Sequence, residues 1–106
     1  MPLFVAVHEY KSQDKITIMK ELAAGFNALQ TGKTPQDVKL HATYSRALGA
    51  YSVWEAPSIE AVEKVFEKFL PTLKKYTEFV PVVQTYPPTM EYIIFCWQQM
   101  IKAASK

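Results

Sequence analysis

Cysteine is almost absent from this 106-residue chain, which contains only Cys96. A single cysteine cannot form an internal disulfide, so a small disulfide-stapled fold is excluded and a reducing compartment is favoured. The chain has no basic and apolar leader, and its apolar run over 92–97 is much shorter than a membrane span. We therefore expect a cytoplasmic protein that does not bind a membrane.

An excess of charge is also missing. Twelve basic residues stand against ten acidic ones, giving a net charge of +2, and Arg46 is the only arginine. This balance provides no basic patch for a phosphate backbone, so nucleic acid is not an expected partner. Hydrophobic residues make up 49% and charged residues 21% of the chain, which is typical of a folded domain with one core. We expect one domain over residues 1–106.

The first half of the chain predicts a strand, a helix and a hairpin. The β-branched and aromatic segment 3–9 predicts a strand, and apolar residues at helical spacing predict a helix over 15–29. A loop over 30–37 follows. Residues 38–48 and 50–55 then predict a hairpin whose turn is centred on Leu48 and Gly49.

The second half predicts a helix, an edge strand and a last helix. Ser58 is suited to cap a helix, which Pro71 is expected to kink or end. Segment 79–86 predicts a strand, and Pro81 places it at the edge of a sheet because proline cannot donate to a ladder. Thr89 is suited to cap a last helix over 90–104, whose apolar residues occupy more than one stripe.

The order βαββαβ with an appended helix predicts an α+β, ferredoxin-like fold. Two right-handed crossovers give a four-stranded antiparallel sheet with the first and third strands central and two helices on one face. The second face of the sheet then needs cover from the last helix or from a second subunit. We expect a homodimer or higher oligomer.

Side-chain alternation predicts what each face of the sheet carries. Leu3, Val5 and Val7 are uniformly aliphatic and are expected on the helix side, which leaves His8 on the uncovered side. A hairpin turn centred on Leu48 and Gly49 brings further polar residues to that side. The predicted ligand-binding cleft is lined by His8, His41, Thr43, Ser45, Ser52 and Trp54.

The sequence leaves two questions about this cleft undecided: the position of Glu55 and the binding of a metal ion. A change of one residue in the turn would move Glu55 beside His41. His8 and His41 are the candidate metal ligands, because imidazole binds borderline metal ions.

Two stretches carry a resemblance to a known family. They are MPLFVAVHE at 1–9 and YSVWEAPSIEAV at 51–62, followed by Val65-Phe66-Glu67. The chain resembles small dimeric α+β barrel proteins grouped with a bacterial nickel-binding family. The resemblance implies a dimer, a histidine site at His8, and nickel or zinc as the candidate ion. The chain has Ser52 where a cysteine is frequent in that family and no histidine in its first helix, so we expect weak metal binding or none.

The opening Met1-Pro2 and the segment Thr31-Gly32-Lys33-Thr34-Pro35 carry a second resemblance. They are similar to the tautomerase superfamily, in which an N-terminal proline is the base, and this implies a tautomerase that uses Pro2.

Three classes of function follow from these patterns. The leading hypothesis is a small-ligand-binding protein, with a divalent metal ion as one possible ligand. The enzyme alternatives are the tautomerase and a cofactor-free monooxygenase or isomerase that uses His8 or His41 as its base. The third class is a structural or interaction module.

Overall fold

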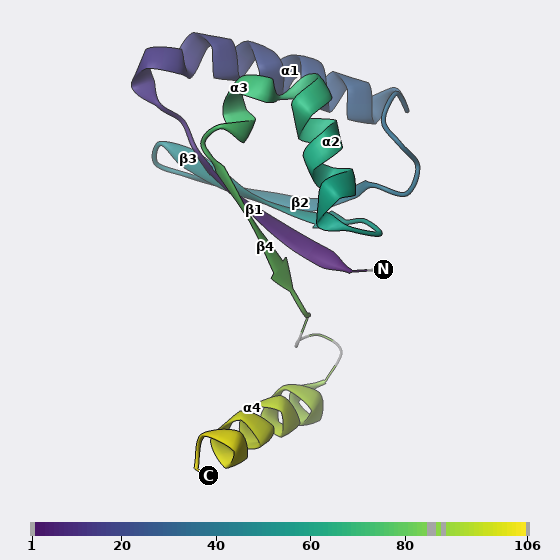
Figure 1. Cartoon of the computed structure of the whole chain (residues 1–106), viewed down its shortest axis with the longest axis vertical. Coiled ribbons are helices and arrows are strands. Elements are labelled where there is room, and N and C mark those ends of the chain that lie inside the picture. The colour runs from purple at the N-terminus through teal and green to yellow at the C-terminus, as the bar shows by residue number, and fades with distance from the viewer. Residues whose placement is uncertain (1, 85–86, 88, 106) are drawn as a thin grey trace.

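The protein folds as an α+β domain from which one helix extends (Figure 1). The computed structural model describes residues 2–84, 87 and 89–105. The strands are β1 (Leu3–Glu9), β2 (Lys39–Arg46), β3 (Gly49–Glu55) and β4 (Thr77–Val82). The helices are α1 (Lys15–Gln30), α2 (Ile59–Phe69), α3 (Pro71–Lys74) and α4 (Met90–Ala104), and a short 3-10 turn, Ser12–Asp14, precedes α1.

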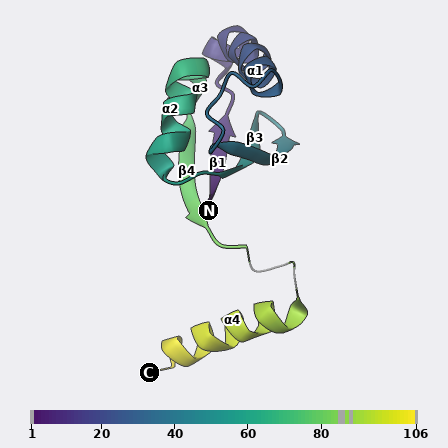
Figure 2. The same ribbon diagram turned by 90° about the vertical axis from the view of Figure 1, so that its right-hand side faces the viewer.

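The four strands form one antiparallel sheet in the order β2-β3-β1-β4, so β1 and β3 are central. Helices α1, α2 and α3 cover one face of this sheet (Figures 1 and 2). This arrangement confirms the predicted ferredoxin-like fold. The domain therefore has a helix layer and a sheet layer, with the core between them.

Most predicted element boundaries agree with the structure. Ser58 accepts a hydrogen bond from the backbone N–H of Ala61, as expected of a cap, and Pro71 separates α2 from α3. The carboxylate of Glu21 on α1 accepts the backbone N–H groups of Thr72 and Leu73, which satisfies the free donors at the start of α3. The last strand is an edge strand as predicted, but it spans Thr77–Val82 and not 79–86, and residues 85 and 86 lie outside the described part of the chain.

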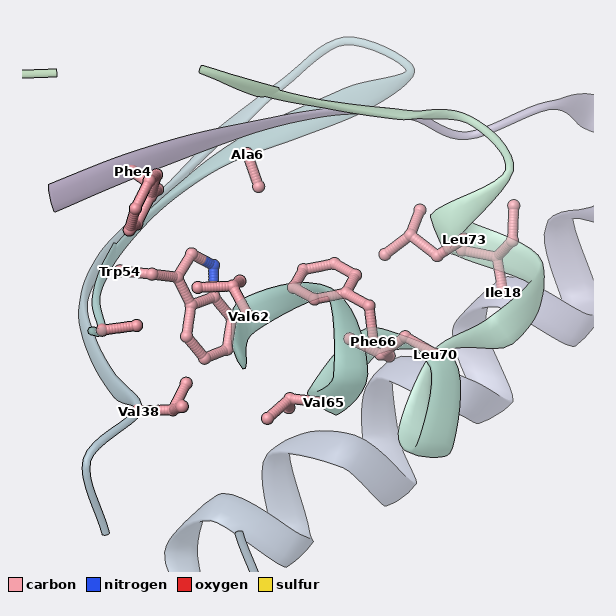
Figure 3. Close-up of a cluster of buried hydrophobic side chains, with 11 residues drawn as sticks. Phe4, Ala6, Ile18, Val38, Trp54, Val62, Val65, Phe66, Leu70 and Leu73 are labelled. Carbon is pink, nitrogen blue, oxygen red and sulfur yellow. The ribbon is translucent and has the colours of Figure 1, made fainter. Parts of the chain in front are cut away.

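The core is built around Phe66 of α2 (Figure 3). Its ring stacks on His8, with the centroids 5.5 Å apart, and meets Trp54 and Phe79 edge to face at 5.5 and 5.0 Å. Ala6, in the middle of β1, is fully buried, and its small side chain leaves room for this ring above the sheet. One aromatic side chain thus joins α2 to three strands.

The two faces of β1 are the reverse of those predicted from the sequence. Phe4, Ala6 and His8 are buried under the helices, whereas the aliphatic side chains of β1, expected there, lie on the opposite face and are only half-buried. Both faces of this strand are largely apolar, so alternation alone did not distinguish them. Packing of Phe66 against His8 and Trp54 decided the orientation.

The turn of the hairpin lies one residue earlier than predicted. Arg46 pairs with Gly49, so Ala47 and Leu48 form the turn, and Leu48 takes a left-handed φ of 61°. Gly49 belongs to β3, where a Cβ atom would lie 2.3 Å from the carbonyl oxygen of His8. The glycine is therefore required for close approach to β1, a constraint that is invisible in a turn-like sequence.

We expect Phe66→Ala to destabilise the domain by about 3–5 kcal/mol, because it removes a buried ring whose neighbours lie on three strands. Urea unfolding followed by far-ultraviolet circular dichroism measures the change. Lys64→Ala, on the exposed face of the same helix, is the control and should change the unfolding free energy by less than about 0.5 kcal/mol. Equal effects of the two substitutions would contradict the placement of the core.

Candidate functional site

His8 lies at the centre of a buried hydrogen-bond network. Its Nδ1 is 2.9 Å from Thr77 Oγ1, and its Nε2 is 2.7 Å from Ser52 Oγ. Ser52 Oγ also accepts a hydrogen bond from the indole Nε1–H of Trp54 at 2.7 Å. Among the described residues, every buried side-chain nitrogen and oxygen has a hydrogen-bond partner. The network therefore satisfies all of its polar groups within the core.

The donors and acceptors of this network assign the tautomer of His8. Thr77 donates its hydroxyl hydrogen to the carbonyl oxygen of Leu73 at 2.7 Å, so its Oγ1 accepts from His8 Nδ1–H. His8 Nε2 then carries the lone pair and accepts the hydroxyl hydrogen of Ser52. Each hydroxyl donates once, and His8 is neutral with its proton on Nδ1.

Burial holds His8 in this neutral form. The side chain is 4% exposed, and desolvation lowers its pKa from 6.5 to about 4. A protonated ring would need to donate from both nitrogens, which would remove the acceptor that Ser52 now uses. The imidazole is thus a fixed hydrogen-bonding group near neutral pH.

A cavity of about 130 Å³ lies between the sheet and α1, beside His8. Leu22 and Phe26 of α1 form its apolar wall. The sheet supplies the rest of the lining, which consists of His8, Tyr10, Thr43, Ser45, Ala50, Tyr51 and Ser52. The lining residues of β2 and β3 include the small side chains of Thr43, Ser45, Ala50 and Ser52.

No residue that lines the cavity carries a charge near neutral pH. His8 is neutral, and partial burial raises the pKa of Tyr10, which keeps its phenol protonated. The remaining lining residues are apolar or carry hydroxyl groups. The cavity is suited to a ligand that combines an apolar body with neutral hydrogen-bonding groups.

Four of the six predicted ligand-binding residues line this cavity: His8, Thr43, Ser45 and Ser52. The prediction placed them on the uncovered face of the sheet, and this was wrong, because that side of β1 and β3 is the one that faces the helices. Trp54 shares their face but lies outside the cavity lining and contributes through its hydrogen bond to Ser52.

His41 is the residue that the structure separates from this group. A β-bulge between Leu40 and Ala42 places Leu40 opposite Trp54 and Ala42 opposite Val53. His41 therefore has no partner residue in the register of β2 and β3. His41 Nε2 instead lies 2.8 Å from Glu55 Oε1 in an exposed pair. The sequence had left open whether Glu55 would lie beside His41, and the bulge, not a longer turn, brings it there.

The two candidate metal ligands do not share a site. His8 is opposite Ala50 and His41 binds Glu55, and positions 50 and 55 of β3 are roughly 16 Å apart at about 3.3 Å per residue. Both ring nitrogens of His8 already have partners. The described part of the chain contains no group of three or more histidine, cysteine, aspartate or glutamate residues that could hold a metal ion.

Sequence reasoning missed Leu22, Phe26, Ala50 and Tyr51 as lining residues. The helical spacing of Leu22 and Phe26 did mark them as facing the core, but the spacing cannot show which part of the sheet a helix covers. Tyr10 follows His8 by two residues, so strand alternation puts it on the same face, and it could have been added to the predicted cleft on that ground.

Comparison with protein-family models, with curated proteins and with solved structures found no match to this chain. The structure shows an α+β protein with a ferredoxin-like sheet and a cavity under α1. Within residues 2–84, 87 and 89–105, no helix has the length and apolar composition that crossing a membrane requires.

We expect the stability of the protein to fall as the pH drops from about 6.5 to 4, because the unfolded chain takes up a proton at His8 that the folded chain resists. The lowered pKa of His8 means that its stabilising contribution is fully present above pH 6.5. It is lost progressively towards pH 4, by roughly 3 kcal/mol. Urea unfolding at several pH values measures this loss.

Two glutamine variants isolate the contribution of His8. His8→Gln should remove this part of the pH dependence, whereas His41→Gln, at the exposed pair with Glu55, should retain it. The same slope in His8→Gln and in the unmodified protein would show that His8 is not buried in its neutral form.

Proposed function

We propose that this protein binds a small, uncharged ring compound in the cavity between the sheet and α1. The observation that carries the proposal is a cavity lined by Thr43 and Ser45 together with the apolar residues Leu22 and Phe26, with no charged lining residue. A charged ligand would lose part of its hydration there without gaining an opposite charge.

The size of the cavity favours a ligand with one ring. A volume of about 130 Å³ is close to that of an apolar cavity of roughly 150 Å³ that accommodates benzene. Phe26 is 37% exposed beside the cavity, so its ring is available to contact a bound ring. A phenol-like compound, with one hydroxyl on an aromatic ring, combines the size and the polarity of this site.

The hydroxyl groups provide the specificity in this proposal. Ser52 already donates to His8 and accepts from Trp54, whereas Thr43 and Ser45 are exposed towards the cavity. Thr43 and Ser45 are therefore the groups that bind the polar atom of the ligand. His8 holds Ser52 and the floor of the site in position.

The site favours binding over catalysis. A base with a pKa of about 4 removes protons weakly at neutral pH, which disfavours His8 as the base of a monooxygenase or isomerase. Pro2 is exposed, its carbonyl oxygen accepts the backbone N–H of Ala56, and it does not line the cavity. A tautomerase that uses Pro2 would need its nitrogen in an apolar pocket.

Phenol, benzoate and benzylammonium test the proposal, because they share one ring and differ in charge. We expect phenol to shift the backbone amide resonances of β2, β3 and α1 around the cavity in a nitrogen-15 correlation spectrum. The two charged compounds should bind at least about tenfold more weakly, since the cavity offers them no counter-charge. Equal binding of all three compounds would contradict an uncharged ligand.

Thr43→Val tests the role of the hydroxyl group without changing the size of the side chain. It should weaken phenol binding by about tenfold, the loss expected from one neutral hydrogen bond. Thr17→Val, on the exposed side of α1 and away from the cavity, is the matched control and should leave the affinity unchanged. Ala50→Leu should fill the cavity and abolish binding, and unchanged affinity in both cavity variants would overturn the proposal.

A further inference from the structure

Helix α4 is an apolar helix that buries none of its residues in the single chain. It stands apart from the sheet and from the other helices in both views (Figures 1 and 2). Trp97 is 53% exposed and Ile101 is 65% exposed. Glu91 and Lys102 are the only charged residues of the helix. A helix of this composition is stable in water only against another surface.

The face of the sheet opposite α1 and α2 is the second unpartnered surface of this chain. Its centre consists of half-buried aliphatic side chains, Leu3, Val5, Val7, Val53, Val80 and Val82. Charged residues, among them Glu9, Glu78 and Arg46, lie at its ends. An apolar centre with a charged rim is the usual anatomy of a protein interface.

We propose that α4 of one copy packs across this sheet face of a second copy, so that two chains exchange their last helices. Each copy has one α4 helix and one uncovered sheet face. In a dimer with a two-fold axis, each chain therefore contributes one helix and receives one. The lengths agree, since α4 is about 22 Å long and a seven-residue strand is about 23 Å long.

The exposed area of α4 is sufficient for such a dimer. Seven of its large apolar residues expose between 41% and 65% of their surface: Met90, Tyr92, Ile94, Phe95, Trp97, Met100 and Ile101. Tyr92 and Phe95 lie on the other side of the helix, beside Gln99 and Lys102. At roughly 200 Å² per side chain, the five residues that share one face leave on the order of 600 Å² per helix to be covered. The two helix faces and the sheet surface that they cover together therefore exceed the size of a standard interface, about 1,600 Å² in total.

The charge of α4 favours a protein partner over a lipid surface. Helices that lie on anionic membranes carry several lysines or arginines on their polar face. In α4 that face carries Glu91 and Lys102, together with Gln98 and Gln99.

Sedimentation equilibrium of the full chain gives the first test. We expect a dimer at micromolar concentration, and Trp97→Glu should weaken dimerisation at least tenfold, because it places a charge in the apolar contact. Gln98→Glu, on the polar face of the same helix, is the matched control and should leave the dimer intact. A monomeric protein, with or without binding to phosphatidylserine vesicles, would overturn the proposal.

Cys96, the single cysteine, allows a second test that locates α4. One sample of the chain carries a spin label on Cys96 and no isotope. It is mixed with a second sample that is enriched in nitrogen-15 and carries Cys96→Ser. We expect broadening of the amide resonances of β1 and β3 in the nitrogen-15 chain, with α1 unaffected. A dimer without such broadening would show that α4 does not cover the partner's sheet. In a separate sample, the spin-labelled chain itself is enriched in nitrogen-15. Broadening of its sheet resonances, without broadening in the mixed sample, would show that α4 packs on its own sheet.

Discussion

The contact of Phe66 with the middle of the sheet is the constraint on which the rest of the structure depends. The ring needs small side chains below it, and Ala6 and Ser52 provide them at paired positions of the two central strands. It also needs flat partners beside it, which His8 and Trp54 provide. These requirements together select the face of β1 that is buried, and the orientation of the other three strands follows from the hydrogen-bonded ladder.

Burial of a histidine next to Phe66 has a consequence for polar groups. His8 must be neutral and must have a partner at each nitrogen, and Ser52 and Thr77 meet that need. The hydroxyl of Ser52 already donates to His8 and accepts from Trp54. The hydroxyl groups of β2 in the cavity lining are those of Thr43 and Ser45. The hydrogen-bond network of His8 therefore holds in place the strand residues that line the cavity.

The structure has two separate features, a cavity under α1 and an uncovered sheet face with the extended helix α4. The cavity is formed within one domain, and no residue of its lining is charged near neutral pH. The sheet face and α4 are both apolar at their centre, and the two surfaces have similar length and low charge. The proposed ligand site and the proposed helix-exchange surface lie on opposite faces of the same sheet, so we expect substitutions at one to leave the other unchanged.

Local patterns along the sequence determined the elements of this protein. Helical spacing, the caps at Ser58 and Thr89 and the position of Pro81 predicted the helices and the edge strand, because each depends on neighbouring residues alone. The handedness of the crossovers then predicted the ferredoxin-like order of the strands. The orientation of β1, the turn at Leu48 and the bulge at His41 depended on contacts between distant segments. Only the tertiary structure decided them, since both faces of β1 are apolar and Gly49 is required by the carbonyl of His8 and not by the turn.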